Sequence, residues 1–137
     1  LHFRIGNPSN TTMAFTFAAA ERAQEIFKEI EPLNIDNSIV RAYGNHPKVK
    51  KLLKRFLASA DASKARIVVS TPGRLKSMIE DESLDPSAFK AVLIDLKQNS
   101  KTQTIMDMKG TKDDLMNLYL NSLCSQASQG TTKFGFC

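Results

Sequence analysis

A short run of residues after an apolar stretch has the chemistry of an anion site. Residues 66–70 form the apolar stretch, and the residues that follow are Thr71, Pro72, Gly73 and Arg74. Threonine and proline begin helices, and the first turn of a helix presents backbone N–H groups and a positive dipole end that favour a phosphate. Gly73 lets a ligand approach the backbone, and Arg74 can donate two parallel hydrogen bonds to a phosphate. Because Thr-Pro starts helices in many proteins, a purely structural role stays open.

Three other positions place polar or flexible residues at the ends of predicted strands. They are Glu21 with Arg22, then Gly44, then Asp95. Asp95 resembles a metal carboxylate, but Mg²⁺ usually needs phosphate ligands beside it, so we expect Asp95 to cap its strand or to pair with a base. No cysteine and histidine cluster has zinc-ligand spacing, so we predict no metal and no cofactor.

A basic stretch forms a second candidate surface. Residues 47–58 have the apolar spacing of a helix, and the rest of that helix is rich in positive charge: Lys48, Lys50, Lys51, Lys54 and Arg55. These side chains could follow an RNA backbone, or they could be a solvated outer face, which is the commoner case. Lys64, Arg66 and Lys76 have the same two interpretations.

The composition limits the class of protein. The chain has 137 residues, 42% of them hydrophobic and 24% charged, with a net charge of +5. These values fit one globular domain with a modest preference for acidic partners. No apolar run is long enough for a membrane span. Cys124 and Cys137 are the two cysteines, which excludes a disulfide-rich scaffold and leaves open whether they pair. Since the chain starts at Leu1, we expect it to be a piece of a longer protein.

Strands and helices are predicted to alternate along the chain. Strands are expected at 13–17, 38–43, 66–70, 91–95 and 102–108, and helices at 19–31, 47–58, 71–80 and after a capping box at 111–114. This order predicts an α/β fold, a three-layer sandwich with a mostly parallel sheet, over residues 1–124. Functional residues in such folds lie beyond the carboxyl ends of the strands. Residues 125–137 are polar and predicted to be disordered, with Phe134 and Phe136 as a possible short docking motif.

Several motifs in the correct order resemble those of DEAD-box RNA helicases. The segment 67–75 is similar to the TPGR motif, and 20 residues separate Arg74 from Asp95, as in the family's spacing to the DEAD sequence. Tyr43-Gly44 resembles the glycine motif, and residues 19–23 resemble the PTRELA motif. The resemblance covers residues 13–95 and implies the fold of the first RecA-like helicase domain, with an RNA site at Thr71–Arg74 assisted by Gly44, Glu21 and Arg22.

The departures from that family are at the positions of nucleotide chemistry. Leu96 stands where the catalytic glutamate is expected, and Gln98 stands where the last aspartate is expected. The chain has no G-x-x-x-x-G-K-[ST] phosphate loop and no SAT motif. The resemblance therefore implies a domain that is not an enzyme.

This combination resembles the 90S pre-ribosomal complex subunits of the small-subunit processome, a degenerate helicase-like family. The shared features are Glu21-Arg22-Ala23, the strand before Thr71–Leu75, the remnant at 92–95 and the helix at 113–119. The resemblance implies a role in ribosome biogenesis in the nucleolus, with pre-rRNA or small nucleolar RNA and processome proteins as partners. The leading hypothesis is a non-catalytic, RNA-associated scaffold.

Two alternatives remain open. The domain could be a protein-interaction module without RNA contact, in which exposed apolar residues near 112–124 matter. It could also belong to an RNA-dependent ATPase whose phosphate loop lies upstream, although that loop could not replace the missing glutamate.

Overall fold

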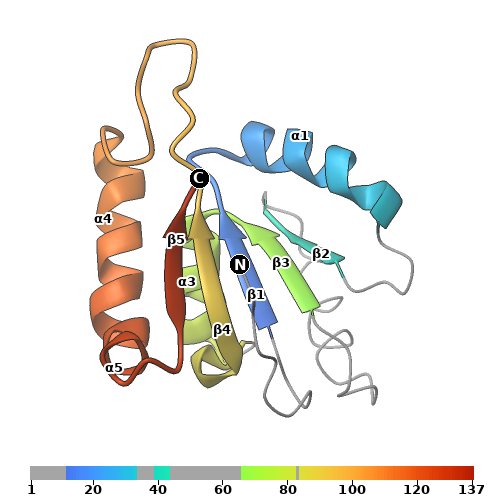
Figure 1. Cartoon of the computed structure of the whole chain (residues 1–137). Helices are drawn as coiled ribbons and strands as arrows, with labels where there is room; N and C mark the ends of the chain where they lie inside the picture. Colours follow the sequence, from blue (N-terminus) through green and yellow to red (C-terminus); the bar gives the residue numbers. More distant parts are fainter. Residues whose placement is uncertain (1–11, 34–38, 44–65, 83) are drawn as a thin grey trace.

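Five strands and their connecting helices make up the described part of the chain. The computed structural model describes residues 12–33, 39–43, 66–82 and 84–137. The strands are β1 (Thr12–Thr16), β2 (Ile39–Ala42), β3 (Arg66–Ser70), β4 (Phe89–Ile94) and β5 (Lys133–Phe136). In the described ranges, helices follow β1, β3 and β4, as Figure 1 shows. The expected helix at 47–58, with its five basic residues, and Gly44 lie outside the described residues.

All strand pairings in the described part of the sheet are parallel. The order is β2-β3-β1-β4-β5, so β1 lies at the centre. Thr16, the last residue of β1, is in register with Ser70 of β3 and Ile94 of β4. The carboxyl ends of these strands therefore share one edge, as the alternating pattern predicted. The α/β class and the mostly parallel sheet are confirmed.

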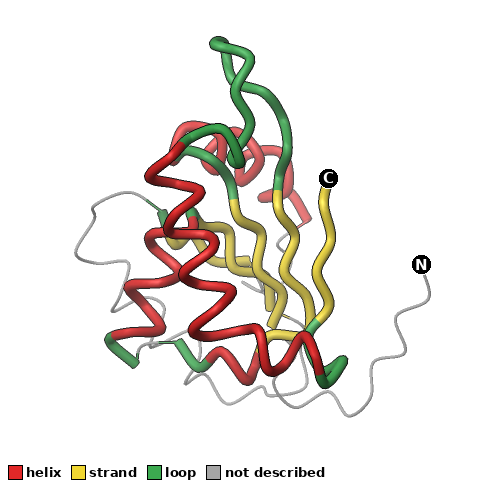
Figure 2. The backbone as a smooth tube through the Cα atoms, turned by 90° about the vertical axis from the view of Figure 1, so that its left-hand side faces the viewer, coloured by secondary structure: helices red, strands yellow, loops and turns green. Residues whose placement is uncertain are grey.

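Helices cover both faces of the sheet because its central strands are apolar on both sides. On one face, helix α1 (Ala20–Ile30) packs Ala23 and Phe27 against Val69. On the other, α3 (Pro72–Glu80) and α4 (Lys109–Leu118) pack around Val68. Figure 2 shows α3 and α4 side by side against the sheet.

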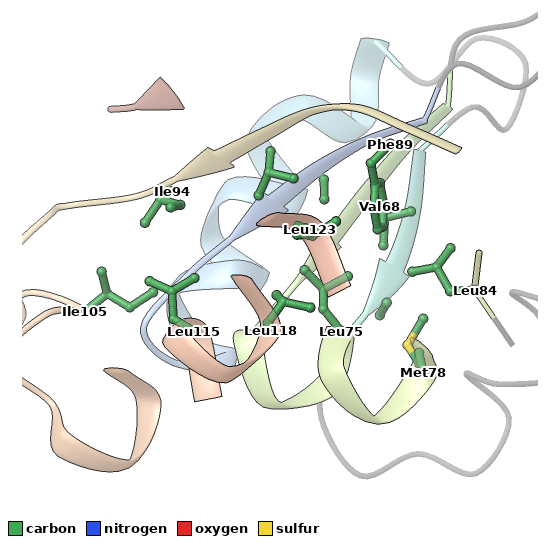
Figure 3. Packing of buried hydrophobic residues seen from close by; sticks show 13 residues of the cluster. Val68, Leu75, Met78, Leu84, Phe89, Ile94, Ile105, Leu115, Leu118 and Leu123 are labelled. Carbon is green, nitrogen blue, oxygen red and sulfur yellow. The ribbon is translucent and has the colours of Figure 1, made fainter. Parts of the chain in front are cut away.

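The larger core lies between the sheet and the pair α3 and α4. Its fully buried side chains include Leu75 and Met78 of α3, Leu118 of α4 and Phe89 of β4, which converge in Figure 3. Burying a side chain of this size stabilises a fold by about 1.5–3 kcal/mol. This core fixes the position of α3, and with it the position of Thr71–Arg74.

The predicted strand at 102–108 was wrong. Residues 95–108 form a long connection without strand structure, closed by side-chain bonds to its own backbone. Asn99 Oδ1 accepts hydrogen bonds from the N–H groups of Lys101 and Gln103, at 2.9 and 3.0 Å. Such local bonds compete with a strand ladder, and alternating residue types do not reveal them.

The predicted capping box at 111–114 was also wrong. Helix α4 begins at Lys109 with Met108 at the N-cap, so Thr111 lies within the first turn. Its hydroxyl donates to the carbonyl of Ala18 instead, at 3.5 Å. The helix continues through a π-helical turn, η3 (Tyr119–Leu123), into α5 (Cys124–Ser128).

Residues 125–137 are ordered in the structure, against the prediction of a disordered tail. Strand β5 pairs with β4, and the buried Thr132 hydroxyl donates to the Phe89 carbonyl at 2.7 Å. The Phe134 ring meets Tyr119 edge to face, with centroids 5.2 Å apart, while Phe136 stays 64% exposed. Cys124 and Cys137 are both free thiols. None of the helices in the described ranges is long and apolar enough for a membrane span.

Candidate nucleic-acid interface

The turn from β3 into α3 follows the predicted geometry. Ser70 ends the strand, Thr71 is the N-cap with extended backbone angles, and Pro72 is the first helical residue. The backbone N–H groups of Arg74 and Leu75 donate to the Thr71 carbonyl at 3.1 and 3.0 Å. The Thr71 side chain makes no capping hydrogen bond to the helix. The hydroxyl is therefore not committed to capping α3.

A groove of about 490 Å³ lies at this turn, at the carboxyl edge of the sheet. Three segments line it: the β1–α1 turn, the first turns of α3 and the first turns of α4. The lining residues are Ala18, Ala19, Ala20, Thr71, Pro72, Gly73, Arg74, Ser77, Thr111 and Asp114. Three alanines and a glycine keep the side chains short, so a ligand in the groove could reach the backbone. The groove thus combines a helix N-terminus, an arginine and accessible backbone.

The groove also contains a carboxylate that the sequence did not indicate. Asp114 Oδ2 lies so near Gly73 that a Cβ at position 73 would be 2.6 Å from it. Its Oδ1 accepts a hydrogen bond from Lys76 Nζ at 3.2 Å. A carboxylate at the start of a helix is electrostatically favourable, so Asp114 stabilises α3 from a neighbouring helix. The same negative charge opposes a phosphate in the groove.

The end of β4 is closed by an ion pair. Asp95 is 7% exposed, and its Oδ2 accepts a hydrogen bond from Arg22 Nε at 3.1 Å. Arg22 Nη1 also lies 3.2 Å from Glu25 Oε2. Desolvation lowers the pKa of Arg22, but the hydrogen bonds to Asp95 and Glu25 and their charges raise that pKa above its usual range. The expectation that Asp95 pairs with a basic side chain is confirmed.

The structure brings together some of the predicted site residues and separates others. Thr71, Pro72, Gly73 and Arg74 line the groove. Arg22 is directed to Asp95, and Glu21 is exposed on the first turn of α1 without lining the groove. Lys76, considered as a phosphate contact, is paired with Asp114.

Two groove residues on α4 were missed by sequence analysis. Thr111 and Asp114 were assigned to a helix cap, yet they contact Ala18 and the α3 segment instead. Their spacing of three residues places them on one helix face, and this spacing could have indicated that they act together. Which element that face meets depends on packing. Among the described residues, no group of three histidine, cysteine or acidic side chains is arranged to hold a metal.

Comparison with known proteins places the chain in a family. A family model described as a U3-containing 90S pre-ribosomal complex subunit, CMS1, matches residues 4–136. Protein CMSS1 of Xenopus laevis is 24% identical over 119 residues, which is 86% of this chain and 42% of that protein. The CMSS1 proteins of Danio rerio and Homo sapiens are 23% and 22% identical, over 93% and 90% of this chain and 43% of each relative. The chain therefore spans less than half the length of these relatives, and it belongs to the family of U3-containing 90S pre-ribosomal complex subunits.

Proposed function

We propose that this domain is a non-catalytic, RNA-associated scaffold in the assembly of the small ribosomal subunit. The groove at the start of α3 would bind the backbone of single-stranded pre-rRNA or small nucleolar RNA. The observation that carries the proposal is that Thr71, Pro72, Gly73 and Arg74 line one groove at the carboxyl edge of a parallel sheet. Family membership and the net charge of +5 support it. Such a role implies protein partners in the 90S complex and a nucleolar location.

The proposed relationship to DEAD-box helicases includes departures that support a non-catalytic domain. We infer that the domain is a degenerate RecA-like domain, on the basis of its motif order and its parallel α/β sheet. A metal-binding aspartate must leave its oxygens open to the ion and the phosphates. In this chain Asp95 is buried, and its Oδ2 accepts a hydrogen bond from Arg22. Leu96 follows where a glutamate would be needed.

The test is binding of a fluorescent single-stranded RNA of about 12 nucleotides across a salt series, measured by anisotropy. We expect Arg74→Ala to weaken binding and to reduce the slope of log K against log salt by about 0.7–1, because one phosphate contact is lost. Arg74→Lys keeps the charge and should retain the slope while losing the two-pronged geometry. Lys90→Ala is the matched control, since Lys90 is exposed near the amino end of β4, at the opposite edge. Equal binding by Arg74→Ala and Lys90→Ala would remove the groove from the proposal.

A second candidate function, protein docking, is favoured by exposed apolar side chains. Met116 and Leu120 are 40% and 61% exposed and lie four residues apart along α4 and η3. Apolar side chains at this spacing lie on one helix face and suit a protein partner. In that case Leu120→Asp would abolish association with 90S particles, and Arg74→Ala would leave it intact.

A further inference from the structure

The connection between β4 and α4 carries a concentration of positive charge. Residues 96–112, here called the lysine loop, contain four lysines and one acidic residue. The lysines are Lys97, Lys101, Lys109 and Lys112, and all are exposed. The acidic residue is Asp107. This loop therefore has a net charge of +3, against +5 for the whole chain.

The lysine loop leaves the sheet at the edge that holds the groove. It begins after β4 and ends in the first turn of α4, where Thr111 lines the groove. Both views show residues 96–108 extending beyond the carboxyl ends of the strands (Figures 1 and 2). Six consecutive residues, 97–102, are exposed, and all have side chains that donate hydrogen bonds. An RNA strand bound in the groove would meet this loop if the RNA continued toward α4.

The loop is held in one shape by its own bonds. Asn99 bonds to the backbone of Lys101 and Gln103, and Asp107 Oδ2 accepts both the N–H and the hydroxyl of Thr104 at 2.8 Å. Ile105 is fully buried and anchors the loop in the main core. A preorganised surface loses less entropy when it binds.

One residue of the loop is held in a conformation that its type disfavours. Thr102 has a φ of 58°, in the left-handed region, although its side chain is β-branched. Such a conformation is unfavourable for this residue type and persists only where surrounding bonds enforce it. Here the enforced conformation presents an exposed basic turn, with Lys101 beside Thr102, away from the sheet.

We propose that the lysine loop is a second contact surface for the RNA phosphate backbone, continuous with the groove at α3. The inference rests on the proposed function and extends it to a longer footprint. Lysines act as point charges that release counterions from phosphates, while the polar side chains of residues 98–102 suit sugar and phosphate oxygens. One strand would pass Arg74 first and then Lys101 and Lys97.

The experiment compares two pairs of lysines that carry the same charge. The loop variant is Lys97→Gln with Lys101→Gln, and the control is Lys90→Gln with Lys133→Gln, at the amino ends of β4 and β5. Each reduces the net charge from +5 to +3. Binding of single-stranded RNAs of about 4 and about 12 nucleotides is measured across a salt series, with circular dichroism to verify folding.

We expect the loop variant to lower the salt slope for the longer RNA by about 1.4, which is 0.7 for each lysine, and to weaken its binding several-fold. The shorter RNA, confined to the groove, should bind the loop variant as it binds the parent chain. The control variant should keep the parent slope for both RNAs.

Each other outcome identifies what failed. Equal slopes for the loop and control variants overturn the loop surface, since only net charge would then matter. A slope lowered by Arg74→Ala but unchanged in the loop variant leaves the groove as the RNA site and overturns the loop. A slope lowered in the loop variant but unchanged by Arg74→Ala retains the loop and overturns the groove. Absence of RNA binding by the parent chain overturns both and points to an acidic protein partner.

Discussion

The ends of β3 and β4 lie at the same edge of one sheet and differ in how their polar atoms are used. After β3, the helix start at Thr71–Arg74 opens into a groove lined by alanines and a glycine. After β4, Asp95 is buried and paired with Arg22. In this domain Thr71–Arg74 line a groove, whereas the Asp95 side chain is buried in an ion pair.

The two ion pairs at these strand ends differ in burial. The Asp95 side chain is 8% exposed, while the Asp114 side chain, paired with Lys76, is 39% exposed. A buried pair strongly affects stability when one partner is removed, whereas an exposed pair contributes little. We therefore expect changes at Asp95 and Arg22 to affect folding, and changes at Asp114 to affect binding.

The largest expected effect comes from breaking the buried pair. Arg22→Ala should lower the free energy of unfolding by about 2–4 kcal/mol, because Asp95 would keep an uncompensated buried charge. Urea unfolding followed by circular dichroism measures this. The control is Glu25→Ala, which removes the exposed partner of the same arginine and should cost less than about 0.5 kcal/mol. Similar small losses in both variants would show that the β4 end is not a closed ion pair.

A smaller effect of opposite sign is expected in the groove. Asp114→Asn should strengthen RNA binding by about two- to fivefold. The negative charge that opposes a phosphate at the start of α3 would be removed, and a charge at a helix N-terminus is worth about 0.3–1 kcal/mol. Asp113→Asn is the matched control, since Asp113 lies on the same helix, is exposed and does not line the groove. Anisotropy titrations of both variants give the comparison. Equal gains would attribute the effect to net charge and would leave the groove without a local role for Asp114.

The smallest effect is a pH response of the lysine loop. The backbone and side-chain hydrogen bonds from Thr104 hold the pKa of Asp107 below its usual value of 3.8. Because the pKa of Asp107 is lower in the folded chain than in the unfolded chain, its ionised carboxylate stabilises the loop at pH values above the unfolded pKa. This stabilisation is lost as the pH falls through the folded pKa. The Thr104 amide resonance should therefore titrate with a midpoint below 3.8 in an NMR pH series. Asp107→Asn should abolish that titration, and a midpoint at or above 3.8 would contradict the observed bonds.

Local patterns predicted the elements that rest on local chemistry. The apolar runs around Val68 and Val92 indicated central parallel strands, and Thr71-Pro72 indicated the start of α3. Strand β5 was missed because Thr132 is buried, and Phe134 partly buried, through contacts with β4 and Tyr119. Composition records how polar a segment is, and it does not record that a neighbouring strand edge is available to pair with it.

Only the α3 side of the candidate site could be predicted from the sequence. Thr71–Arg74 are consecutive, so their chemistry was visible in the sequence. Arg22 was expected to assist RNA binding, but it pairs with Asp95, 73 residues away. Asp114 of α4 lines the groove because it lies next to Gly73, which is also distant in the sequence. Such contacts are set by the packing of whole helices, which residue spacing does not specify.

The central position of β1 has a consequence for how the chain folds. Thr12 pairs with Arg66 and Phe89, which are 54 and 77 residues later in the chain (66 − 12 and 89 − 12). The middle strand of the sheet therefore lacks its first partner until β3 has been synthesised and its second partner until β4 has been synthesised. Long-range pairing of this kind slows folding and leaves apolar strands open to aggregation in the meantime. Early release of a nascent chain that stops before β4 would leave β1 with an open edge and no native partner on that side.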